Sequence, residues 1–169
     1  MKKIIHLTVF LALIAALAGA ALGFANSMTA PVIAANELEA EKVTLKKIYP
    51  DGKFEKVEEN VSKTIQKIFK VEGKGYIFKM KVSGYKDGTS FLVALKADGT
   101  IQDYVAISNG DTSGIGTKVT EEVFATSLKG KDATNKALEE DTITGATISS
   151  KPVILGIQEA AKYQADHLK

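Results

Sequence analysis

The sequence contains no cysteine and only two histidines, His6 and His167. Without thiolates the chain cannot form disulfide bonds, thiolate zinc sites or cysteine-ligated iron–sulfur clusters, and it has no cysteine nucleophile. His6 lies in an apolar N-terminal run and His167 lies near the C-terminus, so a cluster of imidazoles for a metal or a haem is also excluded. Any redox chemistry in this protein must therefore come from an organic cofactor.

Neither sign of charge dominates the chain. The 22 basic residues are nearly balanced by 20 acidic ones, which gives a formal net charge of +2. No long basic stretch is interleaved with aromatic residues, and this argues against nucleic acid as a partner. The 169 residues are 45% hydrophobic, which is enough for one domain with its own core and an appended segment.

An apolar run fills residues 4–25, is interrupted only by His6 and Thr8, and follows Lys2 and Lys3. A helix that crosses a bilayer needs about 20 such residues, whereas the apolar part of a cleavable signal peptide has about 7–15. The length of the run therefore predicts a retained, membrane-embedded anchor.

The two lysines before the run predict its orientation. The positive-inside bias places the N-terminus in the cytoplasm and the rest of the chain outside. We expect a single-pass protein of a bacterial cell membrane, with a transmembrane anchor over residues 1–26 and an extracytoplasmic C-terminal domain. The small residues around Gly23-Phe24-Ala25 leave cleavage of the leader as the alternative.

After the anchor, the sequence predicts a helical linker over residues 27–50 and a folded domain over residues 51–169. Alanine, glutamate, leucine and lysine favour helix in the linker, and Pro50 ends it. Strand character then recurs between turns that contain glycine. The four predicted strands cover residues 64–71, 76–82, 91–95 and 101–107.

The C-terminal part of the chain predicts helices. Residues 121–128 form a short amphipathic segment, residues 130–140 are polar and are expected to be loop, and apolar residues recur at helical spacing over residues 153–167. Residues 91–95 are almost wholly apolar, as expected of a strand that is buried on both faces. The predicted fold class is α+β: an N-terminal transmembrane helix, then a mainly antiparallel sheet with packed helices.

Residues 141–152 form a small, hydroxyl-rich segment that leads into the last predicted helix. Ser149 or Ser150 is expected to be the N-cap of this helix, with Pro152 at its first position. The start of a helix presents unpaired amides and partial positive charge, which bind phosphate, and Lys151 would add a cation. The same features are also consistent with an ordinary capping loop that holds no ligand.

This segment resembles a known motif. Asp141-Thr142-Ile143-Thr144-Gly145-Ala146-Thr147-Ile148-Ser149 is similar to the flavinylation motif of the FMN-binding domain family, Asp-x-x-Ser/Thr-Gly-Ala-Ser/Thr-x-Ser/Thr. In that family a flavin transferase takes FMN from FAD and links its phosphate to the last hydroxyl residue, which is Ser149 here. Ser150 and Thr147 are the alternative acceptors. The resemblance implies that the transferase recognises Asp141, and that the FMN phosphate is surrounded by Thr144, Gly145, Ala146, Thr147, Ser150 and Lys151.

A second stretch, Asp111-Thr112-Ser113-Gly114-Ile115-Gly116, is similar to the Glu-Thr-Pro-Gly-Leu-Gly loop that lies near the flavin in the same family. The residues expected to contact the flavin are Asp111, Thr112, Gly114 and Gly116, with Tyr76, Tyr85 or Tyr104 as candidate aromatic neighbours. Alone, a Gly-x-Gly sequence is a weak signal, because many connections after a strand contain it. Its place about thirty residues before the first motif makes the resemblance more specific.

The resemblance extends to residues 29–37 and to Tyr49-Pro50, which are similar to the G subunit of the Rnf complex. It implies an electron-transfer subunit with covalent FMN in a membrane ion-translocating ferredoxin:NAD oxidoreductase. Such a subunit would catalyse no complete reaction of its own and would have other membrane subunits as partners. The alternatives are a stand-alone extracytoplasmic flavin-based electron carrier or sensor, and a structural domain in which both motifs are only turns.

Overall fold

The fold comes from a computed structural model that describes residues 2–168, apart from the side chains of residues 33–40. The chain divides into two compact units, one ending at Val43 and one beginning at Thr44. Helix α1, Lys2–Ile48, supplies the whole first unit and the first residues of the second. Each unit is described by itself.

Within the first unit, α1 is long and apolar enough to cross a membrane. Within its segment Lys2–Val32, an 18-residue window has a mean hydropathy of 2.4, and none of that window is buried. Helix α1 runs without interruption through Pro31 and ends at Ile48, two residues before Pro50. Residues 2–48 of the expected anchor and linker thus form one helix, while the boundaries expected at residues 26 and 50 stay predictions.

The second unit is built on a five-stranded antiparallel sheet in which each strand pairs with the next one along the chain, in the order β1-β2-β3-β4-β5. This topology follows from short turns, two of which contain Gly73 and Gly99 at positive φ, where glycine adopts the backbone without strain. The α+β class is confirmed. The strands are Phe54–Glu59, Ile65–Val71, Gly75–Val82, Thr89–Leu95 and Ile101–Asn109.

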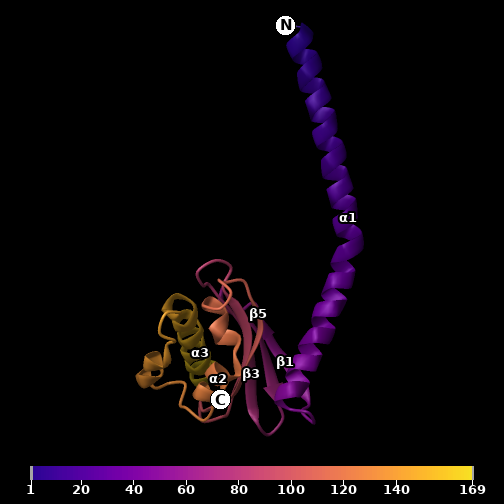
Figure 1. The fold of residues 1–169 in the computed structure, drawn as a ribbon. Helices are drawn as coiled ribbons and strands as arrows, with labels where there is room; N and C mark the ends of the chain where they lie inside the picture. The colour runs from indigo at the N-terminus through magenta and orange to yellow at the C-terminus, as the bar shows by residue number, and fades with distance from the viewer. Residues whose placement is uncertain (1, 169) are drawn as a thin grey trace. The chain divides into compact units, whose positions relative to one another are not determined.

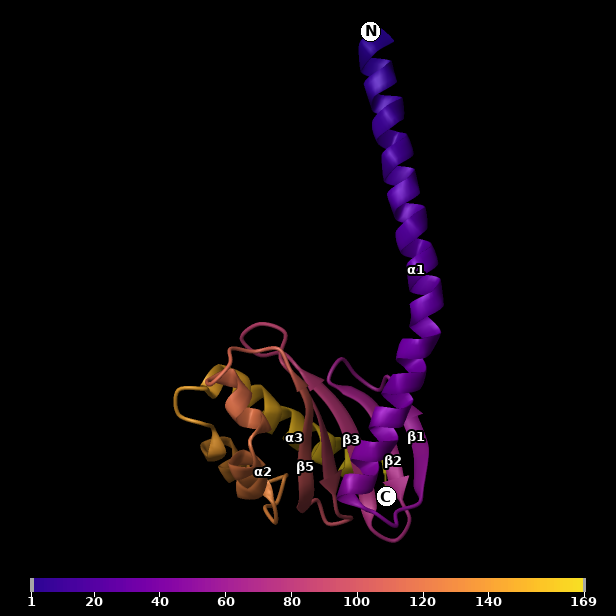
Figure 2. The ribbon, with the colours of Figure 1, turned by 45° about the vertical axis from the view of Figure 1, so that its right-hand side comes forward.

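Both faces of the sheet are buried, because alternate residues of a strand point to opposite sides. Phe78, Phe91 and Val93 belong to one core cluster together with apolar residues of the helices α2 and α3, whereas Leu92 and Ala94 belong to a second cluster with the end of α1. Figures 1 and 2 show α2 and α3 together on one face of the sheet, and their apolar residues belong to the first of these clusters. The expectation that residues 91–95 form a strand buried on both sides is correct.

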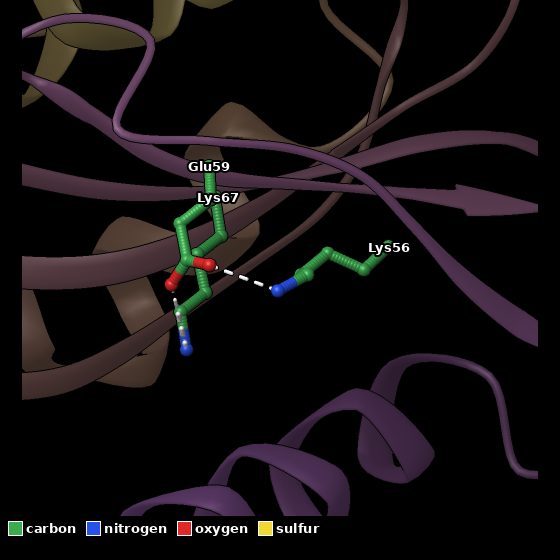
Figure 3. A network of polar contacts seen from close by, with 3 residues as sticks. All are labelled: Lys56, Glu59 and Lys67. Carbon is green, nitrogen blue, oxygen red and sulfur yellow. Dashed lines mark hydrogen bonds and ion pairs between the residues drawn. The ribbon is translucent and has the colours of Figure 1, made fainter.

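The first strand, β1, is not among the predicted strands, because its alternation is dominated by charge. Most of its residues are exposed, and it pairs with β2 across a register shift between Lys56 and Glu58. Figure 3 shows Glu59 between Lys56, at 2.8 Å, and Lys67, at 3.9 Å. The hydrogen bond and charge of Lys56 hold the pKa of Glu59 below its usual value. Exposed ion pairs such as these contribute little stability. The antiparallel pairing with β2 therefore does more than the ion pairs to hold β1 in place.

Two helices and two short 3₁₀ segments complete the unit. They are η1 Gly116–Thr120, α2 Glu122–Leu128, η2 Lys136–Asp141 and α3 Thr147–His167. The stretch expected as loop over residues 130–140 is therefore partly η2, and the last helix begins six residues before the predicted position 153. The early start places Pro152 inside α3 rather than at its first turn. Gly156 of α3 lies so close to β3 that a Cβ there would be 3.0 Å from Val82 Cγ1.

Tyr104 provides a test of the core. Its ring is 2% exposed, and its hydroxyl donates a 3.0 Å hydrogen bond to the Val119 carbonyl at the end of η1. We expect Tyr104→Phe to lower the free energy of unfolding by about 1–3 kcal/mol, since the carbonyl is left buried and unpaired. Urea denaturation measures this loss. Tyr85→Phe, at a side chain that is 66% exposed, is the control and should change stability by less than about 0.5 kcal/mol.

Candidate functional site

Two connections meet at one end of the sheet, the one between β3 and β4 and the one that follows β5. Asp111, just after β5, holds the β3–β4 connection through one carboxylate oxygen. Its Oδ1 accepts hydrogen bonds from the Lys86 amide at 2.9 Å and from the Gly88 amide at 3.3 Å. The return bond from the Gly110 amide to the Gly88 carbonyl, at 3.0 Å, fixes the two connections side by side.

Asn109 orders the connection from β5 into η1. Its Oδ1 accepts from the Asp111 amide at 2.9 Å, while its Nδ2 donates to Thr89 Oγ1 at 2.8 Å and lies 3.4 Å from the Gly116 carbonyl. The Gly116 amide in turn donates to the Thr112 carbonyl at 2.8 Å. The segment with the second motif is therefore a tight turn tied to the sheet.

Gly84 and Gly116 make room for the Asp111 carboxyl group. A Cβ on Gly84 would overlap the carboxylate, and a Cβ on Gly116 would overlap the Asp111 Cβ and lie 2.8 Å from Ser149 Oγ. Asp111 and Ser149 therefore approach the same point of the backbone from two different elements. Glycine at position 116 is needed for this close approach and not for a positive φ.

The start of α3 differs from the predicted cap. Its N-cap is Ala146, which makes no side-chain capping bond, so neither Ser149 nor Ser150 is the N-cap. The Ser150 hydroxyl is instead fully used inside the protein, because it accepts from the Ile143 amide and donates to the Ala146 carbonyl, both at 3.0 Å. Gly145 precedes the helix at φ +82°, and a Cβ there would meet nothing within 4 Å.

The first amides of α3 are available to a ligand. Those of Ser149 and Ser150 donate to the Ala146 carbonyl, and among residues 2–168 no acceptor is present for those of Thr147 and Ile148. A helix start with unpaired amides carries partial positive charge and is suited to bind a phosphate.

A pocket of about 530 Å³ lies where these elements meet. That volume is typical of cofactor sites. It brings together residues of both sequence motifs with three exposed apolar side chains, Tyr85, Ile115 and Ile148. The remaining lining residues are Thr112, Gly116, Gly145, Ala146, Thr147 and Ser149. The pocket thus has an apolar rim, where a planar ring could lie, beside a phosphate-binding helix start.

Asp111 is 8% exposed, and the pKa of its carboxyl is nevertheless lowered. Burial raises its pKa, but hydrogen bonds from the Lys86 and Gly88 amides and the nearby Ser149 hydroxyl together outweigh burial and hold the pKa below its usual value. The Ser149 hydroxyl is close enough to the Asp111 carboxylate to lower its pKa. Even so, among the described residues Oδ2 accepts no hydrogen bond within ordinary distance and angle limits.

Other predicted site residues lie outside this pocket. Asp141 pairs with Lys131, and Thr144 and Lys151 are exposed near the start of α3. Gly114 has φ +75° and nothing within 4 Å of a Cβ, so it shapes the turn without lining the pocket.

Of the three candidate tyrosines, only Tyr85 lines the pocket. Tyr104 is in the core, and Tyr76 lines a different cavity, of about 570 Å³, between the β2–β3 and β4–β5 turns and the end of α3.

Comparison with known proteins agrees with this geometry. Residues 84–162 match the family model of the FMN-binding domain, and this stretch includes both motifs and every residue that lines the pocket. The matched stretch covers a little under half of the chain. Because the matched stretch begins at Gly84, the N-terminal half of the sheet, including β1 and β2, lies outside it.

Two relatives belong to redox complexes. The chain is 28% identical over 152 residues to the G subunit of the proton-translocating ferredoxin:NAD(+) oxidoreductase complex of Clostridium ljungdahlii, and the match covers 80% of this chain and 77% of the relative. It is 30% identical over 92 residues to the G subunit of the ion-translocating oxidoreductase complex of Vibrio atlanticus, where the match spans 47% of this chain and 44% of the relative.

Sequence reasoning missed three residues that the structure places at the site. In the sequence Gly84 is typical of a turn, although in the structure it leaves room for the Asp111 carboxylate. Ile115 and Ile148 look like ordinary motif positions, yet they are 51% and 63% exposed at the pocket. Exposed large apolar residues inside a polar, glycine-rich loop are the signal that could have indicated them.

The two glycines of the second motif should respond differently to substitution. Gly116→Ala inserts a Cβ against Asp111 and Ser149, so we expect a loss of about 1–3 kcal/mol in unfolding free energy and displacement of the start of α3. The Cβ added by Gly114→Ala would meet no neighbour, but the alanine would be held at a positive φ. This lowers the unfolding free energy by about 1–2 kcal/mol. Amide NMR shifts of Lys86 and Ser149 should therefore move in Gly116→Ala and stay in place in Gly114→Ala. Equal shifts in both variants would contradict this assignment.

Proposed function

We propose that this protein is the FMN-carrying electron-transfer subunit of a membrane ion-translocating ferredoxin:NAD oxidoreductase of the Rnf type, with FMN joined through a phosphoester to Ser149. The observation that carries the proposal is the pocket itself. Two motifs that lie about thirty residues apart in the sequence line one cavity with a phosphate-binding helix start and an apolar rim. The names of the two relatives support the assignment to a complex.

The residues around the pocket fit FMN. The unpaired amides of Thr147 and Ile148, with open space at Gly145, would hold the phosphate, and Lys151 at the helix start would add positive charge. Tyr85 and Ile115 would contact the ring and exclude water from it. Bound FMN would supply one-electron and two-electron redox chemistry. The chain has no cysteine, and its described residues contain no cluster of His, Asp or Glu that could hold a metal ion.

Ser149 is the favoured acceptor among the three hydroxyls that the motif offers. Its Oγ approaches Asp111, and the residue lines the pocket although it is only 3% exposed. Ser150 is fully buried, with its hydroxyl engaged by Ile143 and Ala146, so attachment there would break both bonds. Thr147 lines the pocket and is exposed, so it remains the alternative to test.

The N-terminal part of the chain supports a location at the membrane. The apolar run within Lys2–Val32 would supply the membrane anchor, and Lys2 and Lys3 would keep the N-terminus cytoplasmic. We propose an anchor over residues 1–26, a helical linker over residues 27–50 and an extracytoplasmic FMN-binding domain over residues 51–169. A flavin transferase, for which Asp141 would be a recognition residue, is required for maturation. A stand-alone flavin carrier would purify without other redox subunits, whereas this proposal requires that they copurify.

Ser149→Ala should abolish covalent FMN, because a phosphoester requires a hydroxyl, whereas Ser149→Thr should retain it. The measurement is peptide mass mapping of protein coexpressed with a flavin transferase, together with flavin fluorescence of the denatured band. Thr147→Ala is the matched control at the same pocket and should keep one FMN per chain. Circular dichroism confirms that each variant is folded.

Three results of this series have distinct meanings. An adduct on Thr147 would correct the residue and keep the function. A further variant, Ser150→Ala, removes two buried hydrogen bonds and should lower the free energy of unfolding by about 1–3 kcal/mol, so a loss of FMN in it alone is read together with its stability. Wild-type protein from its native membrane without any adduct would falsify the proposed function.

The absence of cysteine gives a clean test of topology. A single Lys63→Cys substitution, in an exposed loop of the domain, should react with a membrane-impermeant maleimide in intact spheroplasts. Reaction is expected because the domain lies outside the cytoplasm, and the cysteine-free wild type is the blank. Labelling that appears only after permeabilisation would place the domain in the cytoplasm and reject the predicted orientation.

A further inference from the structure

We propose that Asp111 is the proton acceptor for Ser149 in the attachment of the flavin, so that this chain carries its own base for the modification of its serine. The inference rests on the proposed function, because it takes Ser149 as the acceptor. It goes further by assigning a chemical step to a residue that sequence resemblance marks only as a neighbour of the flavin.

The geometry supplies the pair. Asp111 and Ser149 lie 38 positions apart in the sequence, yet both approach the space above Gly116, where a Cβ would overlap Asp111 and lie 2.8 Å from Ser149 Oγ. The two residues are 8% and 3% exposed, so little water competes for the contact. A buried serine hydroxyl beside a buried carboxylate is the arrangement that activates a hydroxyl nucleophile.

The two carboxylate oxygens have different surroundings. Oδ1 accepts from the amides of Lys86 and Gly88 and so holds the loops together. Oδ2 is buried without a hydrogen-bond donor among the described residues, and it therefore keeps the capacity to accept a proton. The fixed bonds to Oδ1 keep the carboxylate in place while Oδ2 reacts.

A purely structural role does not explain the negative charge. An asparagine at position 111 would offer the same Oδ1 acceptor to both amides. What asparagine lacks is the capacity to take a proton. A carboxylate can therefore hold the loops through Oδ1 and also accept a proton through Oδ2.

The proposed step is a phosphoryl-group transfer without any change of oxidation state. Ser149 Oγ attacks the phosphorus of the FMN half of FAD, and the new Oγ–P bond forms as the P–O bond of the pyrophosphate breaks. AMP leaves with the bridging oxygen. The hydroxyl proton passes from Oγ to Asp111 and from there to water, while the transferase supplies FAD and its binding site.

The decisive variant is Asp111→Asn, tested on the full chain purified without flavin from cells that lack a flavin transferase. The protein is incubated with purified transferase and FAD, and FMN incorporation is followed by intact mass and in-gel flavin fluorescence. We expect the rate at saturating apo-protein to fall by about 100-fold or more, the usual contribution of a general base. The KM for the apo-protein should stay the same, because the buried Asp111 does not face the transferase.

Asn109→Ala is the matched control. It removes bonds that hold the same loops, to Thr89 and the Asp111 amide, and leaves the carboxylate in place. If Asp111 acted only by holding the loops, Asn109→Ala would slow incorporation as strongly as Asp111→Asn, and both would raise KM. That result would overturn the proposal.

A second measurement keeps the proposal testable if Asp111→Asn does not fold. The Asp111 carboxyl carbon is titrated by NMR in the wild-type apo-protein and in Ser149→Ala. Loss of the serine hydroxyl should raise the pKa of Asp111, because that hydroxyl stabilises the charged form. The same pKa in both proteins would show that the two groups do not interact, and the proposal would be wrong.

The outcomes separate this inference from the proposed function. If the wild type and Asp111→Asn load FMN on Ser149 at the same rate, Asp111 is not the base, and the proposed function still holds. An adduct that maps to Thr147 also rejects the inference alone. Wild type that accepts no FMN under any of these conditions rejects both.

Discussion

The close approach of Asp111 and Ser149 across Gly116 is the constraint on which the site depends. No side chain larger than that of glycine fits between them, and Gly84 leaves room for the same carboxylate from the other side. This single contact joins the β3–β4 connection, the turn after β5 and the start of α3. Because the three segments are brought together by packing and by buried hydrogen bonds, a change in any one of them would alter the pocket as a whole.

The sheet and α3 provide the rigidity that such a contact needs. Both faces of the sheet are buried, and α3 packs so closely on β3 that Gly156 leaves only 3.0 Å between a Cβ and Val82 Cγ1. A helix fixed along its length presents its first turn at a defined place. The site is therefore positioned mainly by the apolar core, while the polar contacts set the details of the loops.

The composition also limits how a flavin could be held. All 22 basic residues are lysines, so the planar, two-pronged recognition of phosphate by arginine does not occur in this chain. Backbone amides at the start of α3, with Lys151 nearby, are what remain for phosphate binding. A covalent bond to Ser149 would add permanence that lysine contacts in water lack. Under the proposed topology this matters, because a domain outside the cytoplasm cannot recover a lost cofactor.

The sequence by itself determined the α+β class, four of the five strands, the apolar N-terminal helix and the two motifs, because hydrophobic periodicity, turn glycines and local runs of residues are local signals. It did not determine the start of α3, the structural role of Ser150, or the pairing of charged β1 with β2. Only the tertiary structure brought Asp111 to Ser149 and left the Oδ2 atom of Asp111 without a donor. Contacts between distant segments depend on how the core packs, and a packed core is a property of the whole chain and not of any stretch of it.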